Sequence, residues 1–217
     1  MEKSSFDKYF DQFPARSFKK HAPLINAGDE FQKIYYLKKG YVRLYSISPE
    51  GKELTLIVYG PGEFFPLFIA LTPPSPYPYW AEAMSPIELI TVPVQSFTSF
   101  FKQNPEILFE LAVRLLTRLS GALRSMENLA FGSAENRLCS VIIVLSQRFG
   151  IRQDEFMLVD APFTHKDLAN LAGLTRETVS AIMSELKKKG IIDYKNQRIL
   201  IKSLPRLTKE SLSQSRT

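Results

Sequence analysis

Near the end of the chain, charged and hydroxyl side chains share one side of a predicted helix. In the stretch LTRETVSAIMSELKKKGI, residues 174–191, a helical repeat groups four apolar residues: Val179, Ile182, Met183 and Leu186. The opposite side carries cations, one acid and small residues: Arg176, Glu177, Ser180, Ala181, Ser184, Lys187 and Lys188. Small residues allow such a surface to lie close against another molecule. Taken alone, the same pattern also fits an ordinary solvated helix.

The residues before this helix predict a second, shorter one. Thr164 can cap its start with a hydroxyl, as Thr175 can for the later helix, and Gly173 can adopt the left-handed turn that ends it. Its inward residues are Leu168, Ala169, Leu171 and Ala172. Two β-rich runs follow, on either side of the polar turn at residues 195–198. Two short helices joined by a glycine turn and followed by a hairpin predict a winged helix-turn-helix.

The positive charge of the chain is confined to this region. Residues 161–217 hold 11 Lys and Arg against 5 Asp and Glu, whereas residues 1–160 hold 17 of each, so the formal net charge of +6 lies in the last quarter. A localised basic surface attracts polyanions and provides affinity for a phosphate backbone. With the winged helix-turn-helix, this charge predicts binding to double-stranded DNA, although a basic tail can also serve solubility alone.

Size and composition limit the other possibilities. The 217 residues, 45% of them hydrophobic, are enough for two modest domains with separate cores. The N-terminus has no apolar run of signal-peptide length and no segment is long enough to span a bilayer, so we expect a cytoplasmic protein without a membrane partner. The single cysteine, Cys139, lies in an apolar helical run and is expected to be buried. We find no nucleophile–base pair, P-loop or zinc site, and expect neither an enzyme nor a bound cofactor or metal.

The first hundred residues predict β-structure. Short β-branched and aromatic runs occur at residues 34–37, 41–45, 54–59 and 87–92, with Gly and Pro at the turns between them. Strands at this spacing suggest a small sandwich or barrel.

A long helix is expected to begin at Pro105, which suits the first turn. Apolar residues recur along it at steps of three and four, and its seam comprises Leu108, Leu111, Leu115, Leu119 and Leu123. Such a seam needs a partner, either the chain's own β-domain or, as we favour, the same helix of a second copy. Residues 131–133 then form a hinge, and Ser133 caps a further helix at residues 134–149.

This order of parts resembles the CRP/FNR family of bacterial transcription regulators. The resemblance covers nearly the whole chain and rests on Gly28-Asp29, Leu37–Val42, Pro49–Lys52, Gly60–Phe64, Asn104-Pro105, Asn128–Phe131 and, most specifically, Leu174–Ser180. It implies an α+β protein with a jelly-roll-like, cyclic-nucleotide-binding-like β-roll at residues 1–103, a dimerisation helix and hinge at 104–131, and a winged helix-turn-helix at 132–217. It also implies a homodimer that regulates transcription at a two-fold symmetric DNA site, with RNA polymerase as a partner if it activates.

The resemblance implies roles within the helix-turn-helix. Arg176 matches the family arginine that donates to a guanine, Glu177 the acid that accepts from a cytosine amino group, and Ser180 a serine that contacts bases in some members. Ala181 stands where cyclic-AMP-responsive members usually carry a second arginine, so one base pair of each half-site lacks its usual reader. The candidate phosphate contacts are Thr164, His165, Lys166, Thr175 and Lys195. For His165, a plain surface position is an equal alternative.

The β-roll departs from the family pattern for binding a cyclic nucleotide. Pro66 and Leu67 align with the family's Gly-Glu pair, and Tyr77 to Tyr79 replace its Arg-Ser/Thr-Ala clamp. A buried phosphate without a cation costs on the order of several kcal/mol, so we expect no response to cyclic AMP. The candidate pocket residues are Pro66, Leu67, Phe68, Tyr77, Tyr79 and Trp80. They either fill the pocket themselves or line it for an uncharged or aromatic effector.

Interpretations from other classes stay open at this point. A cupin-like metalloenzyme fused to a DNA-binding module has a similar strand pattern, but it needs clustered ligands that the single N-terminal His21 cannot supply. A β-roll adaptor would dimerise and act only through protein contacts, which the Arg176-Glu177 pair and the charge asymmetry disfavour. A cyclic-nucleotide sensor with a non-standard pocket is the third alternative.

Overall fold

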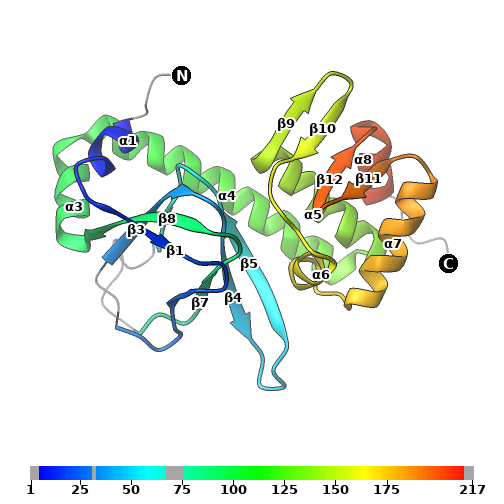
Figure 1. The fold of residues 1–217 in the computed structure, drawn as a ribbon, viewed down its shortest axis with the longest axis horizontal. Helices are drawn as coiled ribbons and strands as arrows, with labels where there is room; N and C mark the ends of the chain where they lie inside the picture. Colours follow the sequence, from blue (N-terminus) through cyan, green and yellow to red (C-terminus); the bar gives the residue numbers. More distant parts are fainter. Residues whose placement is uncertain (1–4, 31–32, 67–75, 213–217) are drawn as a thin grey trace. The chain divides into compact units, whose positions relative to one another are not determined.

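The chain divides into two units, Met1–Leu115 and Leu116–Thr217. The structure is a computed structural model that describes residues 5–30, 33–66 and 76–212 (Figure 1). No helix in these ranges combines the length and the apolar character that crossing a bilayer requires.

Two four-stranded antiparallel sheets form the body of the first unit (Figure 1). One sheet has the order β1-β8-β3-β6 and the other the order β2-β7-β4-β5. The strands are β1 (Ala15–Phe18), β2 (Pro23–Ile25), β3 (Lys33–Lys39), β4 (Val42–Ile47), β5 (Glu53–Tyr59), β6 (Phe64–Phe65), β7 (Trp80–Ala83) and β8 (Ile87–Pro93). Strands far apart in sequence pair with one another, as β1 does with β8 and β2 with β7, so the chain winds into a jelly-roll-like β-roll.

Side-chain alternation gives the sheet β1-β8-β3-β6 a core on each of its faces. On β3, Tyr36 faces the outer core and Leu37 the inner core; on β8, Ile90 and Leu89 divide in the same way. The inner core lies between the two sheets. The outer core is closed by three helices: α1 (Ser5–Phe10), α3 (Val94–Gln103) and the first turns of α4 (Pro105–Phe131).

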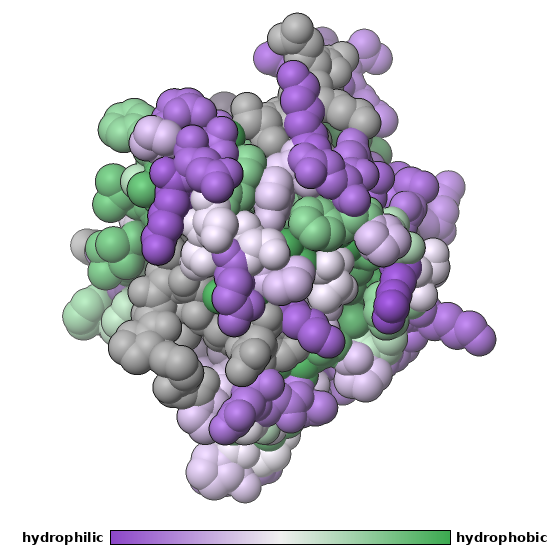
Figure 2. All heavy atoms as spheres, turned by 90° about the vertical axis from the view of Figure 1, so that its left-hand side faces the viewer, coloured by the Kyte–Doolittle hydropathy of each residue, from purple (hydrophilic) through white to green (hydrophobic). Residues whose placement is uncertain are grey.

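The surface of this unit mixes polar and apolar side chains. Figure 2 views the molecule from the side of α1 and α3, and shows hydrophobic side chains at one margin and again near the middle of this face, with polar side chains between and around them. Exposed apolar side chains that lie together can form a contact surface for another molecule.

The predicted strand regions are present as β3, β4, β5 and β8. The turn between β3 and β4 depends on Gly40, which has φ +81° and where an added Cβ would collide with the carbonyl oxygen of Pro86. Strands β1, β2, β6 and β7 were not predicted, because they are only two to four residues long and lack a clear alternation.

The second unit combines helices with a four-stranded sheet of order β11-β12-β10-β9. After α4 come α5 (Ala134–Phe149), β9 (Gly150–Gln153), β10 (Phe156–Val159), α6 (His165–Ala172), α7 (Arg176–Lys188), β11 (Ile192–Lys195), β12 (Arg198–Ile201) and α8 (Leu204–Leu212). Ser133 caps α5 in a reciprocal capping box with Asn136, as predicted for this serine. Cys139 is buried in α5, and burial raises the pKa of its thiol to about 12. The predicted α+β class with a β-roll, a long helix and a winged helix-turn-helix is confirmed.

Candidate nucleic-acid interface

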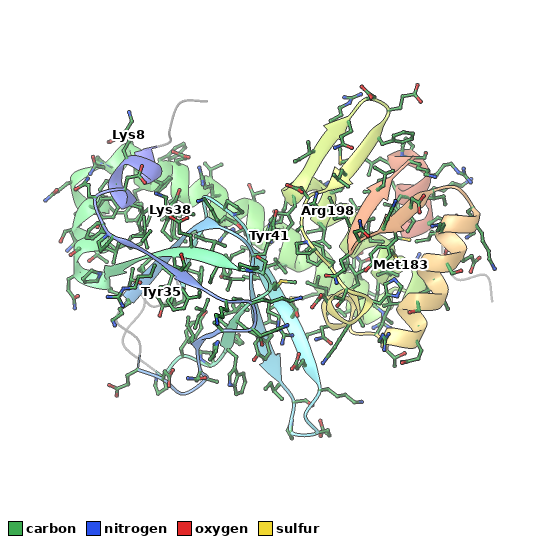
Figure 3. The ribbon with its side chains drawn as sticks, in the orientation of Figure 1. Lys8, Tyr35, Lys38, Tyr41, Met183 and Arg198 are labelled. Atoms are coloured by element: carbon green, nitrogen blue, oxygen red, sulfur yellow. The ribbon has the colours of Figure 1, made fainter. Side chains whose placement is uncertain are left out.

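Helix α7 has a packed side and an exposed side, as predicted. Val179, Met183 and Leu186 are only 0–3% exposed. Figure 3 shows Met183 on the inner side of the helix. Arg176 and Glu177 are exposed in its first turn, and Ala181 is exposed one turn further along. A cation, a carboxylate and a small side chain therefore share the outer surface of this helix.

Capping determines where the two helices of the motif begin. The Thr164 hydroxyl accepts from the Asp167 N–H at 3.1 Å and donates to the Asp167 carboxylate at 2.6 Å. Thr175 caps α7 by accepting from the Thr178 N–H at 3.2 Å. Gly173 ends α6 with φ +61°, the left-handed conformation that glycine adopts without strain. The predicted caps and the glycine turn are confirmed. Because the hydroxyl of Thr164 gives its hydrogen to the Asp167 carboxylate, it has none to donate to a phosphate, whereas the hydroxyl of Thr175 accepts in its cap.

The imidazole of His165 contacts both α7 and the wing. Its Nδ1 lies 2.7 Å from the hydroxyl oxygen of Ser180, and its ring centroid is 4.8 Å from that of Tyr194 on β11. Its Nε2 is buried and has no hydrogen-bond partner within the described part of the chain. Burial, followed by the positive charge of Arg176, lowers the pKa of His165. These contacts turn the imidazole toward the protein, which disfavours its predicted phosphate contact.

The wing ends in a two-residue turn. Asn196 and Gln197 have φ +53° and +62°, as a type I′ hairpin turn requires. Lys195 and Arg198 pair across the two strands that the turn joins. Lys195 is exposed, whereas the Arg198 guanidinium, labelled in Figure 3, lies 2.9 Å from the Asp160 carboxylate. At the tip of the wing, Lys195 thus keeps the more accessible positive charge.

The three lysines at the end of α7 have different surroundings. The Nζ of Lys189 lies 3.1–3.4 Å from carboxylates on α5, α7 and α8: Glu135, Glu185 and Glu210. Lys187 lies 2.7 Å from Asp193, and the hydrogen bond from Lys187 lowers the pKa of that carboxyl to about 2. Lys188 is exposed. Lys189 therefore ties three helices together, a role that the sequence could not reveal because two of its partners lie far away along the chain.

Aromatic side chains fill the interior of the β-roll, where the sequence predicts an effector pocket. Tyr77 is 3% exposed and belongs to the inner core together with Phe65 and Tyr59, whose rings stack at a centroid distance of 4.7 Å. Its N–H donates to the Asp29 carbonyl at 3.1 Å, and its carbonyl accepts from the Gly28 N–H at 2.7 Å. Burial raises the pKa of the Tyr77 hydroxyl. Both the ring and the backbone of Tyr77 are thus held inside the roll.

The remaining predicted pocket residues fall into three groups. Pro66 is buried, and Tyr79 is partly buried with its ring edge-on to Tyr77 at 5.7 Å. Leu67 and Phe68 lie outside the described residues. Within the described part of this unit, no lysine or arginine is buried. The described residues of the whole chain also contain no group of His, Cys, Asp and Glu that could hold a metal ion.

Trp80 faces away from the interior, so its predicted place in the pocket is wrong. Its neighbour on β7, Ala81, is 1% exposed in the inner core, and successive side chains of a strand point to opposite faces. The indole stacks on Tyr45 at 6.1 Å on the outer surface of the sheet. The guanidinium of Arg43 covers the Tyr45 ring at 4.2 Å. This orientation could not be predicted from the residues alone, because the short strand β7 was not recognised.

The leucine seam of α4 is exposed except at Leu111. Leu111 is 3% exposed and packs with Ile107 in the outer core, so it is covered by its own unit and does not belong to an exposed seam as predicted. The other members keep the following exposed fractions: Leu108 44%, Leu115 37%, Leu119 55% and Leu123 58%. Further apolar side chains of α4 outside the predicted seam are also exposed, among them Phe109 and Leu116. An apolar stripe on α4 is therefore exposed in the described part of the chain.

Two family models match this chain. One is described as a cyclic nucleotide-binding domain and matches residues 15–104. The other is described as a Crp-like helix-turn-helix domain and matches residues 136–210.

Relatives that match most of the chain are transcription regulators. A global nitrogen regulator from Nostoc sp. is 27% identical over 186 residues, which are 85% of this chain and 83% of the relative. The cAMP-activated global transcriptional regulator CRP from Haemophilus influenzae is 27% identical over 197 residues, 89% of this chain and 84% of the relative.

Solved structures show the same similarity. A CRP/FNR-family transcriptional regulator from Thermus thermophilus superposes with a TM-score of 0.70 and 28% identity, over 93% of this chain and 100% of the other. A mutant of CooA from Carboxydothermus hydrogenoformans superposes with a TM-score of 0.77 and 24% identity, over 96% of this chain and 92% of the other. The similarity to CooA, at this identity, is one of fold alone.

Proposed function

This chain belongs to the CRP/FNR family of bacterial transcription regulators, and on that premise we propose that it acts as a homodimer that binds a two-fold symmetric site in double-stranded DNA. Its relatives are regulators of transcription and not enzymes. In this proposal residues 1–103 form a sensor-type domain, residues 104–131 pair two chains, and residues 132–217 bind DNA. We also propose a cytoplasmic location, which a DNA target favours. RNA polymerase is a further partner if the protein activates transcription.

Helix α7 reads the bases in this proposal. Arg176 donates to O6 and N7 of a guanine, Glu177 accepts from the amino group of a cytosine, and Ser180 contacts a further base. The observation that carries the proposal is the exposed position of Arg176 and Glu177 on a helix-turn-helix whose region of the chain holds the entire net positive charge. Ala181 leaves one base pair of each half-site without an arginine contact.

Phosphate contacts position the protein without selecting a sequence. We assign them to Lys166, Thr175 and Lys195, which are exposed on α6, before α7 and at the wing. Thr164 and His165 instead make contacts within the protein: Thr164 caps α6, and His165 forms a hydrogen bond with Ser180.

The apolar stripe on α4 supports a homodimer. Large exposed apolar surfaces on a soluble protein mark contacts with another molecule. The stripe recurs with a helical period along α4, from Leu108 to Leu123, as a pairing of two long helices requires. Two copies related by a two-fold axis would present two copies of α7, which matches a site made of two half-sites.

The filled interior of the β-roll supports independence from cyclic AMP. A cyclic nucleotide would have to displace Tyr77, and its phosphate would find no buried cation among the described residues of this unit. We therefore propose that the roll is filled by its own side chains and that cyclic AMP does not control DNA binding. An uncharged aromatic effector would also have to move Tyr77.

Two variants that should weaken DNA binding in different ways test the proposed function. Arg176→Ala should weaken binding to the preferred site by about 1–3 kcal/mol and relax one guanine position, because it removes a bidentate contact to a base. Lys195→Ala should weaken binding to all sequences alike and reduce the salt dependence of binding. Selection from random DNA, followed by gel-shift titration at several salt concentrations, measures both effects. Equal losses by both variants on specific and random DNA would contradict base reading by α7.

A further inference from the structure

We infer that His165 is a positioning residue: it holds the Ser180 hydroxyl as a hydrogen-bond donor toward DNA, so that Ser180 selects a base with an acceptor at that position. This inference rests on the proposed function, in which the outer surface of α7 meets the bases. It assigns to His165 a role in specificity rather than a contact with a phosphate.

The contact joins the two helices of the motif. His165 is the first residue of α6, Ser180 lies in the second turn of α7, and Nδ1 and Oγ are 2.7 Å apart. Tyr194 supports the imidazole from the wing, with ring centroids 4.8 Å apart. The hydroxyl of Tyr194 donates to the Phe163 carbonyl at 2.7 Å, two residues before His165 in the chain. The imidazole is therefore braced on one side by α7 and on another by β11.

The buried Nε2 decides where the imidazole carries its hydrogen. Nε2 has no partner within the described residues, so a hydrogen on it would be a buried N–H without an acceptor. Buried N–H groups of this kind are rare in folded proteins, and leaving one unpaired is costly. A second proton on the ring is also disfavoured, because burial and the charge of Arg176 lower the pKa of His165. The imidazole is therefore neutral, and Nδ1–H donates to the oxygen of Ser180.

This hydrogen bond restricts what Ser180 can recognise. A serine hydroxyl has one hydrogen to donate and two lone pairs that accept. When His165 donates to the oxygen, the hydroxyl hydrogen is left for an acceptor on another molecule. In the major groove, O6 and N7 of guanine, N7 of adenine and O4 of thymine are acceptors, whereas cytosine presents only an amino donor. Ser180 should therefore discriminate against cytosine at the position it faces.

The position of the hydrogen can be measured without DNA. The chain contains two histidines, His21 and His165, so the nitrogen-15 signals of His165 are assigned by comparing the wild type with His165→Phe. Two-bond proton–nitrogen correlation spectra near neutral pH should show a protonated Nδ1 and an unprotonated Nε2 in His165. A hydrogen on Nε2, or averaged shifts from a mobile ring, would overturn the inference. The hydrogen is located in the wild-type protein, and His165→Phe serves only to assign the signals.

Selection from random DNA tests the consequence for specificity. His165→Phe keeps an aromatic ring against Tyr194 but removes both nitrogens, and Ser180→Ala removes the hydroxyl. Each should abolish a preference of about fivefold at the same base pair, the strength of one net hydrogen bond, and leave the guanine position of Arg176 intact. The double variant should lose nothing further, since the two side chains act through one contact. His165→Gln, whose amide can donate to Ser180, should recover part of the preference.

Two outcomes separate the inference from the proposed function. If His165→Phe leaves the preference unchanged, or weakens binding to all DNA alike while the Arg176 position persists, the inference is wrong and the proposed function stands. If the wild type selects no sequence at all, both are wrong. Thermal unfolding of each variant, followed by circular dichroism, establishes that the helix-turn-helix is folded in these comparisons.

Discussion

Replacing Tyr77 with alanine should open a cavity inside the β-roll and destabilise the N-terminal unit. Tyr77 is 3% exposed among the rings of Phe65 and Tyr59, so the change removes an almost completely buried aromatic side chain. Truncating such a ring typically lowers the free energy of unfolding by about 3–5 kcal/mol. The edge-on contact with Tyr79, at 5.7 Å, accounts for about 0.5–1.5 kcal/mol of this loss. We expect a decrease in the upper part of the first range.

The cavity should persist because the backbone around residue 77 remains held. The hydrogen bonds of this backbone with Asp29 and Gly28 do not involve the side chain. Tyr77→Phe is the matched control, since it keeps the ring and should cost less than about 1.5 kcal/mol. Urea unfolding followed by circular dichroism, at a fixed protein concentration, measures both variants. The two units should be fitted as separate transitions, because one two-state model does not suit a chain with two cores.

Small aromatic compounds then distinguish a filled roll from an open one. Phenol or indole should raise the melting temperature of Tyr77→Ala, because an apolar cavity can bind such a compound and binding stabilises the folded state. Neither compound, nor cyclic AMP at millimolar concentration, should stabilise the wild type. Stabilisation of the wild type by phenol would show an open pocket. An unfolding free energy of Tyr77→Ala equal to that of the wild type would refute the packing argument.

Three other perturbations test the helix seam, the reading helix and the buried imidazole. Leu119→Glu should convert a dimer to a monomer in sedimentation velocity, because the dimer contact would bury an unpaired charge. Ser120→Glu, beside the seam, should leave the dimer intact. A monomeric wild type would contradict the homodimer. Ala181→Arg should add a preference for guanine at one further position of each half-site, and an unchanged motif would indicate a different docking register of α7. Since the pKa of His165 lies below its unfolded value of about 6.5, its contribution to stability is complete above that pH and is lost as the pH falls through the folded pKa. The free energy of unfolding should therefore decrease more steeply for the wild type than for His165→Phe as the pH is lowered from about 8 to about 5. An equal decrease in both proteins would contradict the buried imidazole.

Local features of the winged helix-turn-helix were readable from the sequence. The hydroxyls of Thr164 and Thr175, the glycine at 173 and the apolar repeat of α7 all act within one or two helical turns. Capping and helical periodicity depend on residues at most four positions apart, so the order of residues contains the required information. The same holds for the absence of a clamp arginine between residues 77 and 79, which is a matter of residue identity alone.

Only the tertiary structure decided which sides of these elements are covered and which distant residues meet. Leu111 and Leu115 both belong to the apolar repeat of α4, but the β-roll covers the first and leaves the second 37% exposed. Trp80 follows aromatic residues that fill the roll, yet the phase of β7 turns its indole to the outer surface. His165 and Ser180 are 15 positions apart and meet because α6 and α7 pack together. Periodicity describes one element at a time, whereas burial and side-chain contacts depend on how elements distant in sequence pack.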